Sequence, residues 1–426
     1  MPHPLWPRAA LVIALALAAC AAPPPGEGGD PRPDLRGPVT TDERVGTLQL
    51  YRTGDEASLP VIALGRGETL TLEFDLLDAR GPRQLDVSVR RVERDGAPSA
   101  LLPGEYLTGF ERDAILDADA SGATALPYTH FRYTFPNQSI GLRLGGQYVL
   151  RVEASGGAPL FELPFFVSED LVQTEVEIGS RLAERGAIGE ALQPAARLRP
   201  SDELSGVDAS RYTVCFARNG ALDDLRCAPE PSLAELAVFG FYLPADQAFD
   251  LPGPLFSLDL GQLGVGREIT EIDYAAIPPE ALMEPDFAAF GGEINAPALV
   301  TTSGIDAGYR DAGRGDDDAD YVRVLFRYVP VGEREVPGPV YVRGGFTGGA
   351  LRPSARLTWN AEARRYEGSA LVKQGLYAYD YVAPQAPPRQ RPTALGQPTV
   401  FTAFVFYEDL TRFAERLVGV QTVVAR

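Results

Sequence analysis

The stretch "GLYAYDYV", residues 375–382, carries a tyrosine at every second position, at Tyr377, Tyr379 and Tyr381. A period of two places these side chains on one face of a β-strand. Two positions before the stretch lies Lys373, which is the only lysine in the chain. The three tyrosines have two interpretations: they form an aromatic platform for a ligand, or they belong to the protein core.

A second segment with the same form favours the core. Residues 146–152, "GQYVLRV", also begin with glycine, place Tyr148 two positions later and continue with large apolar residues at alternate positions. In immunoglobulin-like sandwiches, a tyrosine near the start of a late strand closes a corner by hydrogen bonding to the backbone upstream. We therefore predict that Tyr148 and Tyr377 are structural corner residues and that Tyr379 and Tyr381 face inward. A ligand platform is the alternative.

Short alternating segments extend through most of the chain and predict an all-β protein. The 44 Gly and 37 Pro favour many turns over long helices. This spacing predicts a first immunoglobulin-like β-sandwich over residues 45–168 and a C-terminal one over residues 318–426. The strands expected in the first are 69–76, 84–92, 129–135, 146–153 and 160–167, and those in the last are 321–329, 339–346, 354–360, 366–372, 376–382 and 399–409.

The region between these two sandwiches has a weaker pattern. Residues 179–192 could form a short helix, but Gly186 and Gly189 fall inside it. Each glycine weakens a helix interior by about 1 kcal/mol relative to alanine. We therefore predict a third, β-rich domain over residues 171–300. The strands expected there include 211–216 and 237–243.

The N-terminus is typical of an exported protein. Arg8 is followed by an apolar run, Ala9 to Ala19, which is shorter than the roughly 20 residues of a transmembrane helix. A positive start, a short apolar run and small residues at its end predict a signal peptide over residues 1–19. The run ends in Leu-Ala-Ala-Cys, which resembles the bacterial lipobox, so Cys20 is the predicted lipidation site. An ordinary signal peptide is the alternative.

A Pro/Gly-rich segment follows Cys20 and shows no apolar periodicity. Such a composition is typical of a flexible linker. We predict that residues 20–44 form the lipid anchor and a tether to the folded body.

Charge and motif content argue against several classes of function. There are 39 Lys+Arg against 58 Asp+Glu, a net charge of -19, whereas nucleic-acid binding needs a basic surface. Beyond the signal peptide there is one histidine, His130, and it lies in an alternating strand. The sequence has no nucleophile elbow, no phosphate-binding loop and no set of Cys and His ligands. We predict no catalytic residue, no metal site and no cofactor.

The acidic run near residue 318 leaves one metal question open. Asp316, Asp318 and Asp320 could supply the oxygen ligands that Ca²⁺ prefers. Tyr321 stands where an EF-hand loop needs glycine, so a solvated linker is the favoured interpretation.

Two further cysteines are 12 positions apart, with a turn between them. Cys215 and Cys227 flank Asn219-Gly220, a dipeptide typical of hairpin turns. A hairpin would bring the two sulfurs together, and a disulfide is permitted outside the cytoplasm. We predict a structural disulfide, with two buried thiols as the alternative.

Several stretches follow the order of segments in one known family. They resemble the plug protein of the bacterial type IX secretion system. Lys373, Gln374 and Gly375 fall inside one of its motifs, whereas Arg90-Arg91 replace a His-Cys pair of the family. The stretches are "LEFDLL" (72–77), "YLTGF" (106–110), "YTHFRYTFPNQSIGLRLGGQYVLRV" (128–152), "FARNGALDD" (216–224), "DADYVRVLF" (318–326), "VYVRGGF" (340–346), "LVKQGLYAYDYV" (371–382) and "FYEDLTRFAERLVG" (406–419).

The resemblance implies a binding role without catalysis. The family plug docks on the periplasmic mouth of a very large outer-membrane translocon barrel and blocks it while no cargo passes. A lipid on Cys20 would then anchor a periplasm-facing body to the outer membrane. The implied partners are the translocon barrel and the membrane, reached through the lipid.

The alternative function is that of a glycan-binding or other surface-interaction lipoprotein. "VYVRGGF" (340–346), followed by a strand ending in tyrosines, also resembles sandwich modules that bind starch-like sugars. Such modules usually carry an exposed tryptophan just after the phenylalanine. Thr347-Gly348-Gly349 stand there instead, and Trp359 lies in an alternating strand.

Overall fold

The computed structural model describes residues 39–40, 42–77, 84–154, 157, 159–182, 190–235, 238–251, 253–261, 263–266, 268–289, 318–386 and 399–425. Cys20, Asp316, and the parts of the predicted tether and of the loop 383–398 that fall outside these ranges are not described. Within these ranges, no helix is long and apolar enough to cross a membrane. Nearly all regular structure is β-strand, which confirms the predicted all-β fold.

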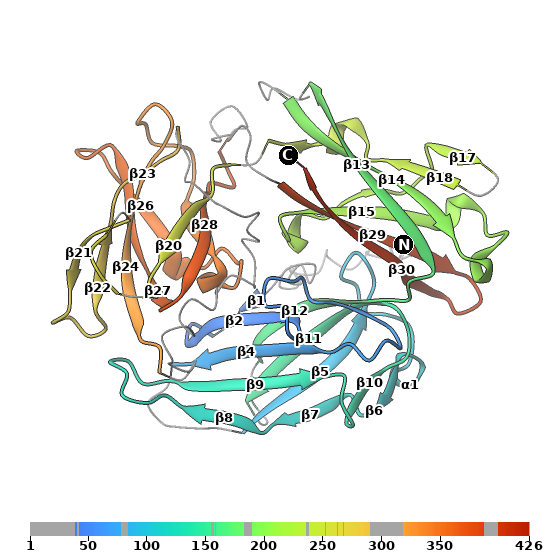
Figure 1. Cartoon of the computed structure of the whole chain (residues 1–426), viewed down its shortest axis with the longest axis horizontal. Helices are drawn as coiled ribbons and strands as arrows, with labels where there is room; N and C mark the ends of the chain where they lie inside the picture. Colours follow the sequence, from blue (N-terminus) through green and yellow to red (C-terminus); the bar gives the residue numbers. More distant parts are fainter. Residues whose placement is uncertain are drawn as a thin grey trace, which may run out of the picture. The chain divides into compact units, whose positions relative to one another are not determined.

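The first sandwich packs two sheets around one core (Figure 1). Phe74 stacks on Phe131 of its own sheet at 5.1 Å and meets Phe161 of the facing sheet edge-on at 4.9 Å. One sheet has the order β2 (Val45–Arg52), β4 (Leu70–Leu76), β9 (Thr129–Phe135) and β8 (Asp117–Ala120). The other has the order β1 (Val39–Thr40), β12 (Pro159–Ser168), β11 (Gly146–Ala154), β5 (Leu85–Val92) and β7 (Arg112–Ile115), with β3 (Val61–Ala63) beside β12. The connections hold the short helix α1 (Pro103–Tyr106) and the strand pair β6 (Leu107–Gly109) and β10 (Ile140–Leu142).

The middle sandwich also has two sheets. Its core combines Leu198 and Phe241 of one sheet with Phe216 and Phe401 of the other. The first sheet has the order β13 (Val172–Leu182), β14 (Glu190–Pro200), β18 (Val238–Tyr242) and β17 (Leu233–Glu235), with β19 (Phe249–Asp250) beside β14. The second has the order β16 (Arg226–Ala228), β15 (Tyr212–Arg218), β29 (Thr399–Asp409) and β30 (Ala414–Ala425).

The third sandwich is one continuous sheet that folds over its own core. Phe326 of β24 and Tyr379 of β28 come from distant parts of this sheet, yet their ring centroids lie 5.2 Å apart. The strand order is β20 (Phe256–Asp259), β28 (Leu376–Val382), β25 (Val340–Gly344), β26 (Arg356–Asn360), β27 (Arg365–Lys373), β24 (Tyr321–Val329), β22 (Glu280–Met283) and β21 (Ile269–Asp273), with β23 (Asp286–Phe287) beside β24.

Strand pairing divides the chain differently from the prediction of separate domains over 171–300 and 318–426. β29 pairs along β15 from Tyr212 to Arg218, so residues 399–425 complete the middle sandwich. β20 pairs with β28, so residues from 256 onward belong to the third sandwich. The third sandwich is therefore inserted into the middle one. The physical reason is that alternation shows which face of a strand is apolar, whereas the partner of a strand depends on long-range contacts.

Two smaller differences concern predicted non-strand segments. Val39-Thr40 were assigned to the tether, but they form β1 and pair with β12. The segment 179–192 contains the end of β13 and the start of β14, in agreement with the doubt about a helix; Gly186 and Gly189 lie outside the described residues.

Candidate functional site at the sandwich junction

The single lysine lies in a buried ion pair between two sandwiches. Lys373 ends β27 of the third sandwich, and its Nζ is 2.8 Å from Oδ2 of Asp75, on β4 of the first sandwich. Lys373 is 3% exposed and Asp75 0% exposed. Charged side chains are almost never buried to this degree unless they are paired. The pair therefore fixes the two sandwiches against each other at this point.

Both oxygens of the Asp75 carboxylate are engaged. His130 Nδ1 is 2.8 Å from Oδ1, and the Tyr321 hydroxyl donates to Oδ2 over 2.7 Å. Burial by itself raises the pKa of Asp75, but the charge of Lys373 and the hydrogen bond from His130 outweigh it, so the pKa lies below its usual value. Burial and the Asp75 charge raise the pKa of Tyr321 well above its usual range. Asp75 is therefore ionised and Tyr321 keeps the proton that it donates.

Aromatic rings enclose the pair. Lys373 Nζ lies 4.5 Å from the ring centroid of Tyr128, a cation–π geometry, and Tyr128 meets Tyr321 edge-on at 5.4 Å. Thr47 Oγ1 lies 2.7 Å from the Tyr321 hydroxyl. The Tyr321 ring rests on the backbone of Gly46, where an added Cβ would lie 2.3 Å from the hydroxyl oxygen. This junction, formed by Asp75, His130, Lys373, Tyr321, Tyr128 and Thr47, is called the polar junction below.

The predicted corner tyrosine of the third sandwich holds the lysine in place. The Tyr377 hydroxyl donates to the Lys373 carbonyl over 2.7 Å, four residues upstream. Gln374 exchanges hydrogen bonds with Asp320, from its amide to the Asp320 carbonyl and from the Asp320 amide to its Oε1. The Gly375 carbonyl accepts from Leu260 on the other side. All three residues of the family motif therefore have structural partners.

The alternating tyrosines of residues 375–382 face the core. Tyr377, Tyr379 and Tyr381 are 2%, 0% and 8% exposed. Tyr379 and Tyr381 both donate to Oδ2 of Asp286, at 2.7 and 2.6 Å. Rings buried in this way leave no face for a sugar to stack on.

The first sandwich has a matching corner next to the middle sandwich. The Tyr148 hydroxyl donates to the Leu144 carbonyl over 2.6 Å, again four residues upstream. The next amide, that of Gly145, donates to Oε1 of Glu169. Glu169 in turn forms an ion pair with Arg416 of β30. Each corner tyrosine thus hydrogen-bonds to a segment, at Leu144 or at Lys373, that contacts a second sandwich.

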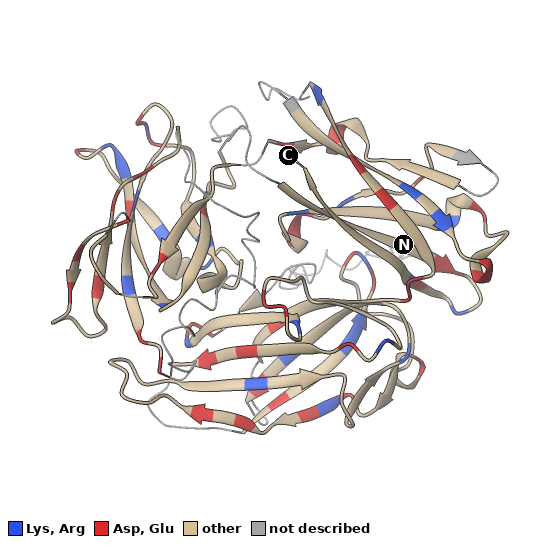
Figure 2. Cartoon of the chain, viewed as in Figure 1, with Lys and Arg blue, Asp and Glu red and all other residues tan. Residues whose placement is uncertain are grey.

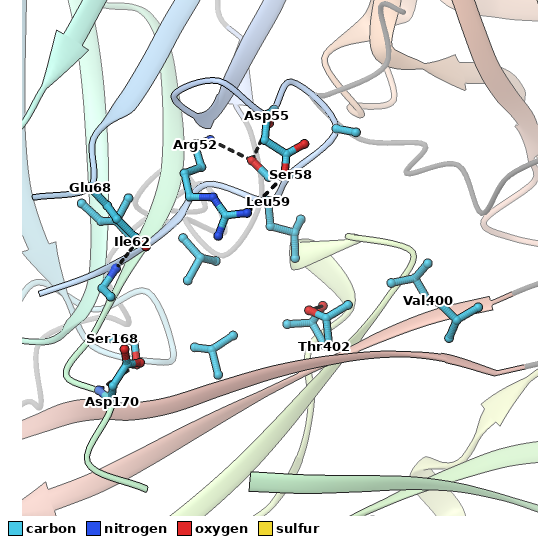
Figure 3. Close-up of a pocket in the computed structure, with 16 residues that line it drawn as sticks. Arg52, Asp55, Ser58, Leu59, Ile62, Glu68, Ser168, Asp170, Val400 and Thr402 are labelled. Atoms are coloured by element: carbon cyan, nitrogen blue, oxygen red, sulfur yellow. Dashed lines mark hydrogen bonds and ion pairs between the residues drawn. The ribbon is translucent and has the colours of Figure 1, made fainter. Parts of the chain in front are cut away.

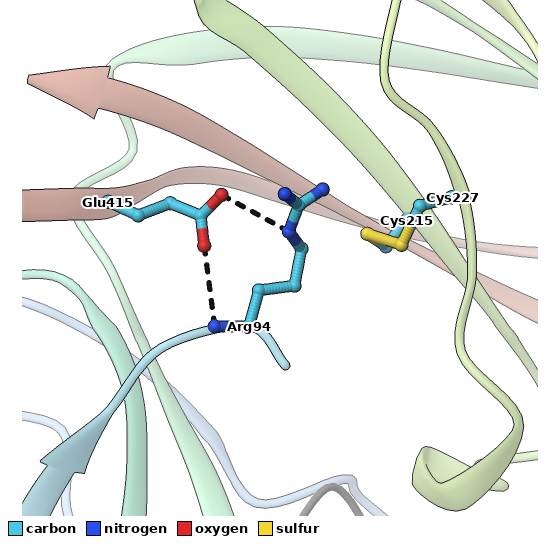
Figure 4. Close-up of a disulfide and its surroundings, with 4 residues drawn as sticks. All are labelled: Arg94, Cys215, Cys227 and Glu415. Carbon is cyan, nitrogen blue, oxygen red and sulfur yellow. Dashed lines mark hydrogen bonds and ion pairs between the residues drawn. A yellow bond between two sulfur atoms is a disulfide. The ribbon is translucent and has the colours of Figure 1, made fainter. Parts of the chain in front are cut away.

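A further ion pair joins the first and middle sandwiches beside the disulfide. Arg94 Nε lies 3.1 Å from Oε1 of Glu415 (Figure 4). Cys215 and Cys227 are directly opposite in the β15–β16 ladder and form a disulfide. Cys215 is fully buried against Phe404 and Leu417 in one cluster. The disulfide is a staple of the middle sandwich.

Positive and negative charges alternate over the described strands. Figure 2 shows acidic residues on β4 and β8, to either side of a basic position on β9. The basic residue is Arg132, whose Nε lies 2.6 Å from Oε1 of Glu73. Interspersed charges of this kind do not make the basic surface that phosphate backbones require.

A cavity of about 500 Å³ lies where the first sandwich meets the ends of β29 and β30 (Figure 3). Its polar groups are already engaged: Arg52 pairs with Asp55 at 3.1 Å, and Glu68 accepts from the Ala63 amide. Val400 and Thr402 line the opposite wall. Among the described residues that line it, the groups able to act as acids, bases or nucleophiles are carboxylates and hydroxyls, such as Asp170 and Ser168, and these two are hydrogen-bonded to each other.

The one histidine of the polar junction has a structural contact. His130 Nδ1 is engaged with Asp75, and Nε2 is buried without a hydrogen-bond partner in the described part of the chain. No serine or cysteine is among the groups around it. The described residues also contain no group of three His, Cys, Asp or Glu that could hold a metal ion. Asp320 is one of the three aspartates considered above as Ca²⁺ ligands. Its carboxylate accepts a hydrogen bond from the Ala125 amide at 2.6 Å.

The described residues form a protein built from β-sandwiches. Residues 45–169 match the family model "Type 9 secretion system plug protein 1st domain", and the predicted first sandwich spanned 45–168. The match confirms the resemblance drawn from the sequence: the chain carries the first domain of the type IX secretion system plug protein family. The match over these residues supports a role related to type IX secretion.

One solved structure has the same fold over nearly its whole length. It is a hypothetical protein from Parabacteroides merdae ATCC 43184, with 20% sequence identity and a TM-score of 0.80 over 91% of this chain and 99% of that one. The BSP domain of a biofilm associated protein was also matched, with 6% identity and a TM-score of 0.16 over 94% of this chain and 62% of that one, too low to indicate a shared fold. No curated protein matches the sequence.

Proposed function

We propose that this chain is a non-enzymatic component of the type IX secretion system that docks on the periplasmic mouth of the outer-membrane translocon barrel and plugs it. The observation that carries the proposal is the match of residues 45–169 to the plug first domain. The core shared by the first and middle sandwiches supports it, because a body that blocks a wide pore needs a part that stays rigid.

The same proposal includes an anchor. Cys20 would carry the lipid, and the residues up to the start of β1 would tether the body to the outer membrane, facing the periplasm. A tether of that length lets the body reach a neighbouring barrel without leaving the membrane.

The test is recovery of the tagged protein from detergent-solubilised outer membranes, with identification of its partners. The proposal predicts that the giant translocon barrel is recovered in a fixed ratio to the tagged chain. As a control, the same tag on an unrelated periplasm-facing lipoprotein should recover none of it. Recovery of polysaccharide-uptake proteins alone would overturn docking and support the glycan-binding alternative.

A further inference from the structure

The first and middle sandwiches share a hydrophobic core. Phe166 of the first sandwich is fully buried in one cluster with Phe404 and Leu417 of the middle one, and the rings of Phe166 and Phe404 are 4.5 Å apart. Ala414 of β30 packs into the core of the first sandwich. The backbone also crosses this junction, because the amides of Glu169 and Leu171 donate to β30. These two sandwiches are therefore one structural unit.

The hydrophobic core of the third sandwich is separate from the cores of the other two. Its hydrophobic cluster contains only residues between Phe256 and Tyr381. Among the described strands, none pairs across to the first sandwich. Polar contacts and one pair of rings join the two. The polar contacts are the Lys373–Asp75 pair at 2.8 Å, the Tyr321–Thr47 hydrogen bond at 2.7 Å, Arg352 donating to the Val45 carbonyl at 2.7 Å, Ser354 donating to Glu43 at 2.9 Å, and the Ala125 amide donating to Asp320 at 2.6 Å. The rings are those of Tyr128 and Tyr321, edge-on at 5.4 Å.

These two kinds of junction behave differently when they separate. Parting the first and middle sandwiches would expose phenylalanine and leucine to water, which is unfavourable throughout the separation. Parting the polar junction lets water solvate every group that it uncouples. A half-open polar junction is the unfavourable state, because it leaves Asp75 or Lys373 buried without its partner. Contacts between domains of one chain that are largely polar commonly allow the domains to move as units.

We propose that the third sandwich is a movable domain, closed on the first sandwich by the Asp75–Lys373 pair and able to separate from it as an intact unit while the first and middle sandwiches stay joined. The chain path permits this. Both ends of the third sandwich, at Phe256 and Val382, lead back to the middle sandwich and not to the first. The inference goes beyond docking and does not depend on it, because the motion belongs to the isolated protein.

The test uses the full mature chain in detergent micelles and the double variant Asp75→Asn/Lys373→Met. Removing both charges together avoids leaving one of them buried and unpaired. Hydrogen exchange followed by mass spectrometry reports each junction separately. Peptides over residues 121–128, where the Ala125 amide donates to Asp320, report the polar junction, and those over 169–171, whose amides donate to β30, report the apolar one.

The expected result is exchange at least tenfold faster in the polar-junction peptides, with unchanged exchange at residues 169–171 and a larger radius of gyration in solution scattering. The matched control is Arg364→Met/Glu333→Gln, which removes an exposed ion pair within the third sandwich, 3.4 Å apart, and should change none of these values. Equal acceleration in all peptides, or no acceleration in any, would overturn the proposal.

A second variant separates opening from unfolding. A Cβ built on Gly348 lies 3.6 Å from the Leu48 Cβ, within the range that a disulfide bridges, and because Gly348 has a φ of +65° the reduced form of the variant is the reference for backbone strain. Leu48→Cys/Gly348→Cys, placed in the Asp75→Asn/Lys373→Met background and oxidised, should return exchange at 121–128 to the wild-type rate, and reduction should release it again. If exchange stays fast with the clamp closed, local unfolding is the cause and the movable-domain account is wrong.

Discussion

At the scale of single residues, the junction is organised around one carboxylate. Asp75 receives Lys373, His130 and Tyr321, which come from both sandwiches. Such a group contributes little net stability, because the cost of desolvating two charges offsets most of their attraction. Its value is orientation: only one arrangement of the two sandwiches satisfies all of its partners.

Gly46 tests how tightly Tyr321 is held. In Gly46→Ala the new methyl group would lie 2.3 Å from the Tyr321 hydroxyl oxygen and 3.0 Å from Cζ. The ring cannot shift without breaking its bonds to Thr47 and Asp75, so we expect a loss of about 1–3 kcal/mol in the free energy of unfolding by urea titration. Gly104→Ala is the control, since nothing lies within 4 Å of its added Cβ. Equal stability of Gly46→Ala and the wild type would show that the ring is loosely held.

Asp286 makes the stability of the third sandwich depend on pH. Burial raises its pKa to about 6, although the hydrogen bonds from Tyr381 and Tyr379 lower it in part. The native state therefore binds a proton more tightly than the unfolded chain does. The stability that this contributes is full below about pH 4 and is lost as the pH rises through 6.

Replacing Asp286 removes that dependence. Asp286→Asn should gain stability relative to the wild type as the pH rises from 4 to 7, by about 2–3 kcal/mol, since one pKa unit corresponds to about 1.4 kcal/mol. Urea titrations at each pH unit measure the difference. The exposed Asp117→Asn is the control. Parallel pH profiles for the wild type and Asp286→Asn would contradict the assignment.

Sequence patterns predicted some site residues and missed others for definable reasons. Lys373 was conspicuous because it is the only lysine. Tyr377 was conspicuous because it lies two positions after a glycine, as Tyr148 does. For Asp75 the sequence offers one indication: it is a carboxylate in the mostly apolar segment "LEFDLL" (72–77). The strand β4, which contains it, is buried along its whole length. The Asp75 partner Tyr321 lies 246 positions away, and no local pattern encodes such a pairing.

At the scale of elements, the two corner tyrosines have the same geometry in different sandwiches. Each hydroxyl donates to a carbonyl four residues upstream, and each anchored segment continues into a junction. The corners therefore connect the stability of a sandwich to the placement of its neighbour.

Removing either hydroxyl should show separately how each corner affects the stability of its own sandwich and the placement of the neighbouring one. Tyr148→Phe and Tyr377→Phe should each lose about 1 kcal/mol or more in unfolding free energy, through a carbonyl left without its partner. Tyr377→Phe should also accelerate exchange in peptides of the polar junction, and Tyr148→Phe should not. Tyr212→Phe is a matched control, because the Tyr212 hydroxyl is buried without a partner in the described structure and its loss costs nothing. If Tyr212→Phe lost as much unfolding free energy as Tyr148→Phe and Tyr377→Phe, the corner hydrogen bonds would have no special effect on stability.

Most predicted strands agree with the structure to within a residue or two, including β4, β12 and β29, which are buried on both faces. The predicted segments 129–135, 321–329 and 376–382 coincide with β9, β24 and β28. β30 was missed. Leu417, Val418 and Gly419 are consecutive buried residues, because one face meets the middle core and the other meets the first sandwich, so no period of two appears.

At the scale of the whole molecule, three sandwiches are joined in two different ways. Hydrophobic burial unites the first and middle ones, and a polar junction closes the third onto the first. The insertion of the third sandwich could not be predicted, because β15, which ends at Arg218, pairs with β29, which begins at Thr399, and alternation does not show which strands pair. The fold class and the family resemblance were accessible from local pattern, and the connectivity was not.

The proposed function requires that this body closes the translocon pore, and conductance measures closure directly. The purified barrel is reconstituted in a planar bilayer, and the mature chain is added to its periplasmic side. We predict a concentration-dependent, saturable fall in conductance, which heat-denatured protein and protein added to the other side do not produce. Conductance that stays at the level of the open barrel at saturating concentrations of folded protein would contradict the account.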